Sequence, residues 1–205
     1  ILFFAGCNVK DEDFLRPNIL VILTDQQSSN TVSWVGNPNV RTPALDEIAS
    51  KGIFFTESYC TSPVCGPSRS SIITGKMPHE TGAVWNPTQL RPETPTLGDI
   101  FAKAGYNTVW AGKWHVKSEF PARQKLDSVR GFKVIPFTVP ENENVRLNLG
   151  RFSAGGLWTF GEFTDRPIAD AAIDYISNYN EQKPFLLAVS LHNPHDINHL
   201  VRASK

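Results

Sequence analysis

A carboxylate and an amide side chain, Asp25 and Gln26, come at the end of an apolar run, Ile19–Leu23. Carboxylate and amide oxygens are the ligands that Ca²⁺ and Mg²⁺ prefer in proteins. The alternative is an aspartate that hydrogen-bonds the backbone of its own loop, as Asp commonly does in turns. The pair indicates a candidate divalent-cation site. Because the end of a strand lies outside the core, we expect replacement of Asp25 to leave the fold nearly intact.

A lysine and a histidine, Lys113 and His115, lie two residues apart just after a second apolar segment, Tyr106–Ala111. In an extended chain this spacing projects both side chains to one side. It would place a fixed positive charge beside an imidazole that titrates near neutral pH. The alternative is a solvated lysine beside a hydrogen-bonded histidine.

Three histidines, His192, His195 and His199, follow the last apolar segment. A histidine placed just after a strand can donate a proton to a leaving group. Zinc motifs present their histidines on one face of a helix, whereas these lie beyond a strand near a proline, so a zinc site is not expected. His199 and a fourth histidine, His79, are expected to be structural or surface residues.

The elements that must position these side chains alternate between strands and helices. The expected strands are 19–23, 53–55, 106–111 and 184–191, and the expected helices are 44–51, 68–75, 96–104 and 165–180. The first strand has the continuous apolar pattern of a strand buried on both faces. The alternation predicts an open α/β fold with a mostly parallel central sheet and helices on both faces. In such sheets ligands bind beyond the carboxyl ends of the strands, where the candidate residues fall.

The stretch from 120 to 161 lacks a sustained period, and we expect excursion loops that could include short hairpins. Long loops of this kind are often functional.

Composition limits the classes of function. The chain has 205 residues, 40% of them hydrophobic, with 20 basic and 20 acidic side chains. This length buries a core without disulfide or metal support, and a single domain is the default. The balanced charge lacks the electrostatic signature of nucleic-acid binding. No apolar run reaches the roughly 18 residues that a membrane-spanning helix needs.

The first residues, Ile1–Cys7, form an apolar run that ends in Ala-Gly-Cys and is followed by polar residues. This pattern resembles the tail of a bacterial lipoprotein export signal, whose cysteine is lipidated. It predicts an exported protein, periplasmic or anchored in the outer membrane through Cys7; a short strand with a buried thiol is the alternative. The three cysteines are an odd number, so at least one is unpaired or modified. For Cys60 we expect a buried free thiol rather than a disulfide with Cys65.

The segment Cys65–Gly75, CGPSRSSIITG, resembles the active-site signature of the type I sulfatases, Cys-x-Pro-Ser-Arg followed by a short helix to Thr-Gly. Three further segments resemble motifs of that family in the same order: 18–25 its first strand and metal-binding start, 112–115 its Gly-Lys-Trp-His, and 194–195 its Pro-His. The resemblance implies an alkaline-phosphatase-like fold. Family members are usually more than twice as long, so 17–205 would be the N-terminal part of the catalytic domain, after a signal end and polar leader at 1–16.

The resemblance also implies a chemistry. A formylglycine-generating or anaerobic maturation enzyme would oxidise Cys65 to formylglycine, whose hydrate binds a divalent cation, Ca²⁺ or else Mg²⁺ or Mn²⁺. One hydroxyl would attack sulfur and the other would drive release of sulfate, which is covalent catalysis in two steps. The substrate would be a sulfated carbohydrate or an aryl or alkyl sulfate. The implied roles are metal binding by Asp25, Gln26 and residue 65, diol stabilisation by Arg69, sulfate binding by Lys113, assistance to the diol proton by His115, and leaving-group protonation by His195.

A predicted helix start at Ser68, after the turn formers Gly66 and Pro67, would hold Cys65 at a helix N-terminus. The helix dipole there favours an anionic oxygen. It would also acidify an ordinary cysteine, so a thiolate nucleophile is a competing interpretation.

Two departures from the family pattern keep other functions open. Many members have Asp where this chain has Gln26, and the Gln form also occurs in related phosphonate monoester hydrolases and phosphodiesterases. The family's remaining metal ligands lie beyond Lys205, so the 205-residue chain alone is expected to be inactive. An alternative from another class is a non-catalytic lipoprotein that binds sulfated or phosphorylated glycans through Arg69, Lys113 and the exposed aromatics among Trp34, Trp85, Trp110, Trp114 and Trp158.

Overall fold

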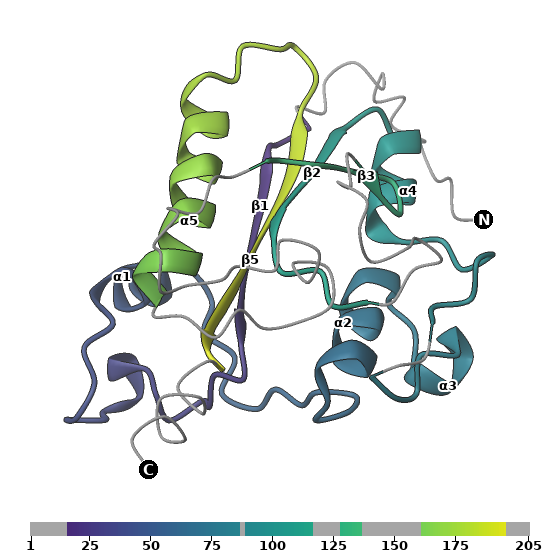
Figure 1. Cartoon of the computed structure of the whole chain (residues 1–205). Coiled ribbons are helices and arrows are strands. Elements are labelled where there is room, and N and C mark those ends of the chain that lie inside the picture. Colours follow the sequence, from purple (N-terminus) through teal and green to yellow (C-terminus); the bar gives the residue numbers. More distant parts are fainter. Residues whose placement is uncertain (1–15, 87–88, 117–127, 137–160, 196–205) are drawn as a thin grey trace, which may run out of the picture.

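A five-stranded sheet forms the centre of the computed structural model, which describes residues 16–86, 89–116, 128–136 and 161–195. The strand order is β1-β5-β2-β4-β3. The strands are β1 (Ile19–Asp25), β2 (Asn107–Gly112), β3 (Ser128–Val129), β4 (Phe132–Val134) and β5 (Phe185–Pro194). All neighbouring pairs are parallel except β3 with β4. The predicted, mostly parallel α/β sheet is confirmed. The strands β1 and β5, which come first and last along the chain, lie side by side (Figure 1).

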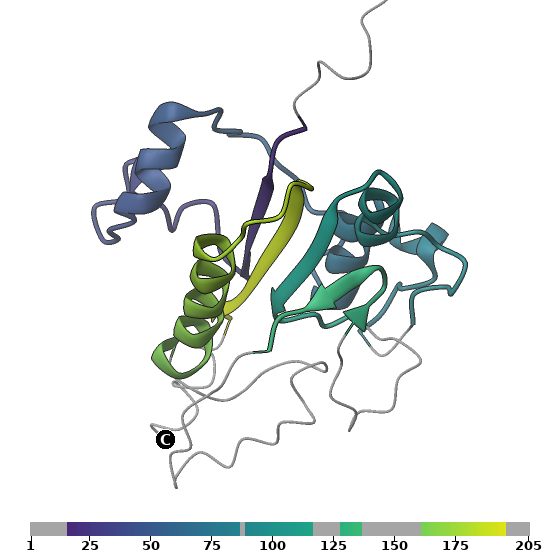
Figure 2. The same ribbon diagram turned by 90° about the horizontal axis from the view of Figure 1, so that it is seen from above.

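Helices cover both faces of this sheet, as predicted. They are α1 (Pro43–Lys51), α2 (Cys65–Thr74), α3 (Pro78–Thr81), α4 (Leu97–Lys103) and α5 (Gly161–Ser177), with a short 3₁₀ turn at Ser33–Val35. Figure 2 shows α5 on one side of the sheet and α2 with α4 on the other. Alternate residues of one strand therefore serve opposite faces: Val109 packs in the cluster of α5, whereas Trp110 packs in the cluster of α2 and α4.

The strand β1 lies at the edge of the described sheet, and the expectation that both its faces are buried was wrong. Leu20 is 47% exposed and Ile22 is 52% exposed, while the alternate residues Ile19, Val21 and Leu23 pack against the core. The reason is that α5 packs on β5 and β2 and does not cover the face of β1 that carries Leu20 and Ile22.

Two other local expectations were wrong. The apolar residues Ile53–Phe55 form no strand, because no described strand pairs with them, and Ile53 is 82% exposed. Cys60 carries a free thiol, as expected, but it is exposed rather than buried.

The helix boundaries differ from the predicted ones by a few residues at most. The helix α2 begins at Cys65, three positions before the predicted start at Ser68, and α5 runs over Gly161–Ser177 rather than 165–180. A short hairpin, β3–β4, lies in the stretch for which we expected excursion loops that could include short hairpins, so it agrees with that expectation. Residues 1–15, with Cys7, and the segment with His199 lie outside the described residues. No helix in the described part is long and apolar enough to span a membrane.

Candidate active site

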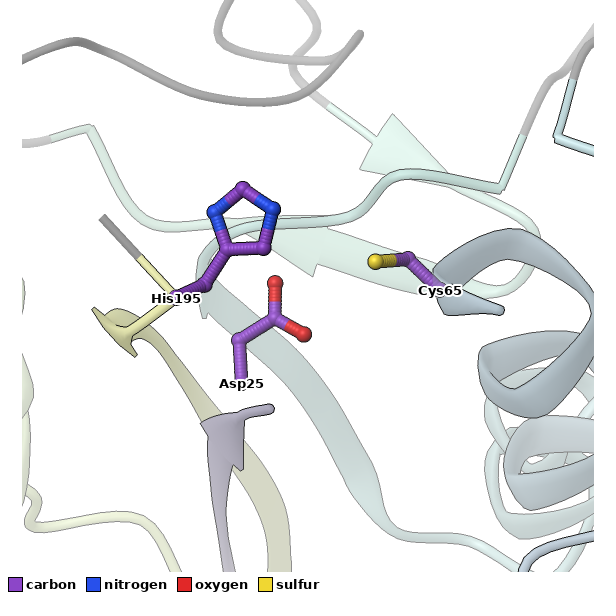
Figure 3. A group of neighbouring side chains, drawn as sticks. All are labelled: Asp25, Cys65 and His195. Carbon is purple, nitrogen blue, oxygen red and sulfur yellow. The ribbon is translucent and has the colours of Figure 1, made fainter. Parts of the chain in front are cut away.

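The carboxyl ends of three parallel strands meet the N-terminus of α2 at one end of the sheet. Asp25 ends β1, Lys113 follows β2, and His195 follows β5, while Cys65 is the first residue of α2. One carboxylate oxygen of Asp25, the Cys65 sulfur and one ring nitrogen of His195 all lie within 4.8 Å of one another (Figure 3). Residues 25, 65 and 195, predicted from separate motifs, therefore form one cluster.

The position of Cys65 is set by the first turn of α2. Val64 is extended and precedes the helix, so the chain turns into the helix at Cys65. The next N–H, of Gly66, donates to Asn86 Oδ1 at 2.8 Å, and a Cβ on Gly66 would come within 3.1 Å of that oxygen. A larger residue at position 66 would therefore require the Asn86 side chain to shift. The role of Asn86 was missed, because its position outside any motif gives no sequence signal.

Arg69 lies one helical turn after Cys65 and so faces the same side of α2. It is only 5% exposed. Its Nη1 donates to the carbonyl oxygen of Lys113 at 2.9 Å and to Ser190 Oγ at 2.7 Å, and its Nη2 lies 3.7 Å from Asp25 Oδ2. The guanidinium therefore ties α2 to the carboxyl ends of β1 and β2 and to Ser190 within β5.

Lys113 is fully buried, and its ammonium group contacts Asp25 Oδ2. The backbone N–H of Lys113 donates to the Ser190 carbonyl at 2.8 Å. The preceding Gly112 has φ +90°, and a Cβ there would lie 2.1 Å from the same carbonyl oxygen. Only glycine allows this approach, which turns the chain out of β2 and directs Lys113 into the site. Ser190, which contacts both Arg69 and Lys113, is a second residue that sequence reasoning missed.

The neighbouring cations keep Asp25 ionised, whereas burial keeps Cys65 protonated. Burial alone would raise the pKa of Asp25, but the hydrogen bond and charge of Lys113, with the charge of Arg69, hold that pKa below its usual value. Burial, and then the negative charge of Asp25, raises the pKa of the Cys65 thiol. The expected acidification at the helix N-terminus is outweighed, so the geometry disfavours the thiolate nucleophile.

His115 is a neutral base in this environment. Burial first, and then the charges of Lys113 and Arg69, lowers its pKa to about 4. Between Lys113 and His115, the intervening Trp114 packs into the core against Trp110. The backbone of His115 is left-handed, with φ +52°, rather than extended.

The donor set fits part of a site for a hard divalent cation. Asp25 is a buried, ionised carboxylate next to residue 65, and such oxygens suit Ca²⁺. Gln26 is exposed and left-handed, with φ +62°, so its predicted role as a ligand stays a prediction. Asp25 and Gln26 fall short of the six to eight oxygens that Ca²⁺ usually takes.

Comparison with known proteins gives a consistent picture. A family model described as Sulfatase matches residues 17–202. The chain is 31% identical over 194 residues to an ulvan-active sulfatase of Formosa agariphila, covering 88% of this chain and 36% of that protein. It is 30% identical over 201 residues to an N-acetylglucosamine-6-O-sulfatase of Bacteroides thetaiotaomicron, covering 95% and 34%.

A solved structure described as a 2-O glycosaminoglycan sulfatase superposes with a TM-score of 0.72 at 29% identity, covering 92% of this chain and 37% of that one. The chain thus spans about a third of the length of the relatives that it matches.

Proposed function

The chain belongs to the sulfatase family, and from this premise we propose that the complete protein hydrolyses sulfate esters at the cluster around Cys65. One observation carries the proposal: residues 25, 65 and 195 come from three different motifs and meet within 4.8 Å. The buried cations Arg69 and Lys113 line the same site.

The charge balance of the site suits a sulfate ester. Arg69 and Lys113 bring two positive charges, and Asp25 brings one negative charge. A net positive site attracts an anionic ester and stabilises charge on its sulfuryl oxygens during transfer. Arg69 is held by Ser190 Oγ and the Lys113 carbonyl, and Lys113 is held by the Ser190 carbonyl and the Asp25 carboxylate. Both cations therefore need little reorganisation when the substrate binds.

Two groups that the family uses would supply the nucleophile. Formylglycine at position 65 and a divalent cation, Ca²⁺ or else Mg²⁺ or Mn²⁺, held by Asp25, Gln26 and residue 65, would provide a reactive oxygen for attack on sulfur. The thiol itself is a poor candidate, because its raised pKa keeps it protonated.

The two histidines of the site have separate proton roles in this proposal. His115 is neutral at neutral pH because its pKa is about 4, so its ring can accept a hydrogen bond or a proton from residue 65. His195 lies at the outer end of β5, and its N–H donates to the Asp25 carbonyl at 3.0 Å. Its ring can donate a proton to the oxygen that leaves with the alcohol.

A sulfated sugar is the substrate class that the relatives favour. Their names specify ulvan, N-acetylglucosamine-6-O-sulfate and glycosaminoglycan chemistry. Trp34 and Trp85 are 46% and 61% exposed, whereas Trp110 and Trp114 belong to the core and cannot contact a glycan. Trp158 lies outside the described residues. As part of the same proposal, the protein is exported and anchored through Cys7.

The test compares substrates on the complete enzyme, produced in a host with the maturation machinery. The proposal predicts turnover of 4-nitrophenyl sulfate and of a sulfated monosaccharide, lost in Cys65→Ala and kept in the matched variant Cys60→Ala. Preferential turnover of aryl phosphonate or phosphodiester would favour the related phosphonate monoester or phosphodiester hydrolases. Glycan binding without turnover of any of these substrates would favour the non-catalytic lipoprotein.

A further inference from the structure

At the carboxyl-terminal end of β5, the pairing register with its neighbour β1 shifts. Leu23 pairs with Ser190, but Asp25, only two residues later, pairs with Pro194. The strand β5 therefore carries extra residues between Ser190 and Pro194, as in a β-bulge. The bulge directly precedes His195, so its shape decides where that histidine lies.

A single carboxylate on a different element accepts the N–H groups of this bulge. Asp165, on α5, accepts from the His192 N–H at 2.7 Å and from the Asn193 N–H at 2.9 Å. Its Oδ2 also accepts from the Asn193 side-chain amide at 2.9 Å. In a regular strand consecutive N–H groups point in opposite directions, so two of them on one carboxylate require the bulged backbone.

The Asp165 carboxylate is suited to this task because it is ionised and mostly buried. Its side chain is 16% exposed. Burial alone would raise the pKa of Asp165. The His192 ring, whose Nδ1 lies 3.6 Å from Asp165 Oδ1, and then the N–H donors of His192 and Asn193 lower that pKa below its usual value. Hydrogen bonds to a charged acceptor are stronger than neutral ones, so the contact fixes the bulge firmly.

We propose that Asp165 is a positioning residue for the reaction: it holds the 192–193 bulge from α5 and thereby sets the place of His195 beside Asp25 and residue 65. The bulge is held by Asp165 on one side, and His195 is held by the Asp25 carbonyl on the other. This inference rests on the proposed function, since it concerns the proton that His195 gives to the leaving group.

The test replaces Asp165 in the complete, matured enzyme by Ala and by Asn. The asparagine keeps the size of the side chain but offers one acceptor oxygen and an NH₂ group that would face a backbone N–H. The matched control is Asp170→Ala, which removes a carboxylate from the same helix whose partner is the exposed Arg166.

The kinetic readout is the dependence on the leaving group. A misplacement of about 1 Å can cost about 100-fold in rate. We expect Asp165→Ala to slow an alkyl sulfate by about 100-fold and 4-nitrophenyl sulfate by less than about 10-fold, since the latter leaves without help from an acid. In a His195→Ala background the same change should cost less than about 3-fold, because residues that act as a unit are not additive. Equal losses on both substrates, or full additivity with His195→Ala, would overturn the proposal.

A second readout does not depend on activity. Hydrogen exchange at the amides of His192 and Asn193 should speed up at least 10-fold in Asp165→Ala and Asp165→Asn, and stay unchanged in Asp170→Ala. Unchanged exchange in the Asp165 variants would overturn the structural part of the inference. If exchange rises but the wild-type enzyme turns over no sulfate ester, the proposed function fails while the hold of Asp165 on the bulge stands.

Discussion

Asp25 is a proposed metal ligand and also balances the buried positive charges of the site, and its removal tests that charge balance. Its carboxylate is 8% exposed and faces two buried cations, Lys113 at 0% and Arg69 at 6% exposure. Replacement by alanine leaves both positive charges buried without their partner. Breaking a buried ion pair from one side typically costs about 3–5 kcal/mol. The sequence alone led us to expect that this change would leave the fold nearly intact. With Asp25 paired to two buried cations, we now expect a measurable loss of stability.

The assay is urea unfolding of the complete protein at pH 7, with a chelator present so that loss of metal does not contribute. We expect Asp25→Ala to lower the free energy of unfolding by about 3–5 kcal/mol. The control Asp170→Ala removes an exposed carboxylate from its pair with Arg166 and should cost under about 1 kcal/mol.

The choice of pH follows from the sign of the pKa shift. Because the folded pKa of Asp25 is lowered, its contribution is fully present above the unfolded value of about 3.9 and is lost as the pH falls through the folded pKa. The difference between wild type and Asp25→Ala should therefore shrink in acid. A loss for Asp25→Ala no larger than that of the control at pH 7 would show that Asp25 does not stabilise the two buried cations.

The remaining predictions concern the two histidines. His195→Ala should slow alkyl sulfates by about 10²–10⁴-fold and 4-nitrophenyl sulfate by less than about 10-fold, as steady-state kinetics on both substrates would show; equal losses would indicate a structural or sulfate-binding role. His115 has a folded pKa of about 4, so the unfolded chain binds more protons below about pH 6.5 and stability falls as the pH drops. Lowering the pH from 7 to 4.5 should reduce the free energy of unfolding by about 2 kcal/mol through this histidine, and His115→Gln should lack this part of the loss. Urea unfolding of both proteins at the two pH values measures it, and a wild type that loses no more stability than His115→Gln would contradict the prediction.

The residues of the site that the sequence predicted are those whose type carries the chemistry. Asp25, Cys65 and Lys113 follow apolar segments or begin a helix, and the parallel sheet brings such positions to one edge. The residues that sequence reasoning missed act through geometry. Asn86 and Ser190 form hydrogen bonds whose partners are 20 and 121 residues away, and no local pattern encodes such distances.

Prediction of the fold succeeded where a structure depends on residues that are close in sequence. It failed where the structure depends on residues that are distant in sequence. The apolar runs of β1 and β5 look alike, but among the described strands β5 has a neighbour on each side and β1 has one neighbour. The residues Ile53–Phe55 have high strand propensity and still form no strand, because strand formation needs a pairing partner.

The central claim, that Cys65 in its converted form is the reactive residue of a sulfate-ester hydrolase, is tested most directly on the peptide that carries it. Trypsin releases residues 52–69, which hold both Cys60 and Cys65. After denaturation and iodoacetamide treatment of active enzyme, Cys60 serves as an internal control for alkylation. We expect a peptide with one alkylated cysteine at position 60 and an aldehyde at position 65. An active enzyme whose peptide is fully alkylated at both positions would contradict it.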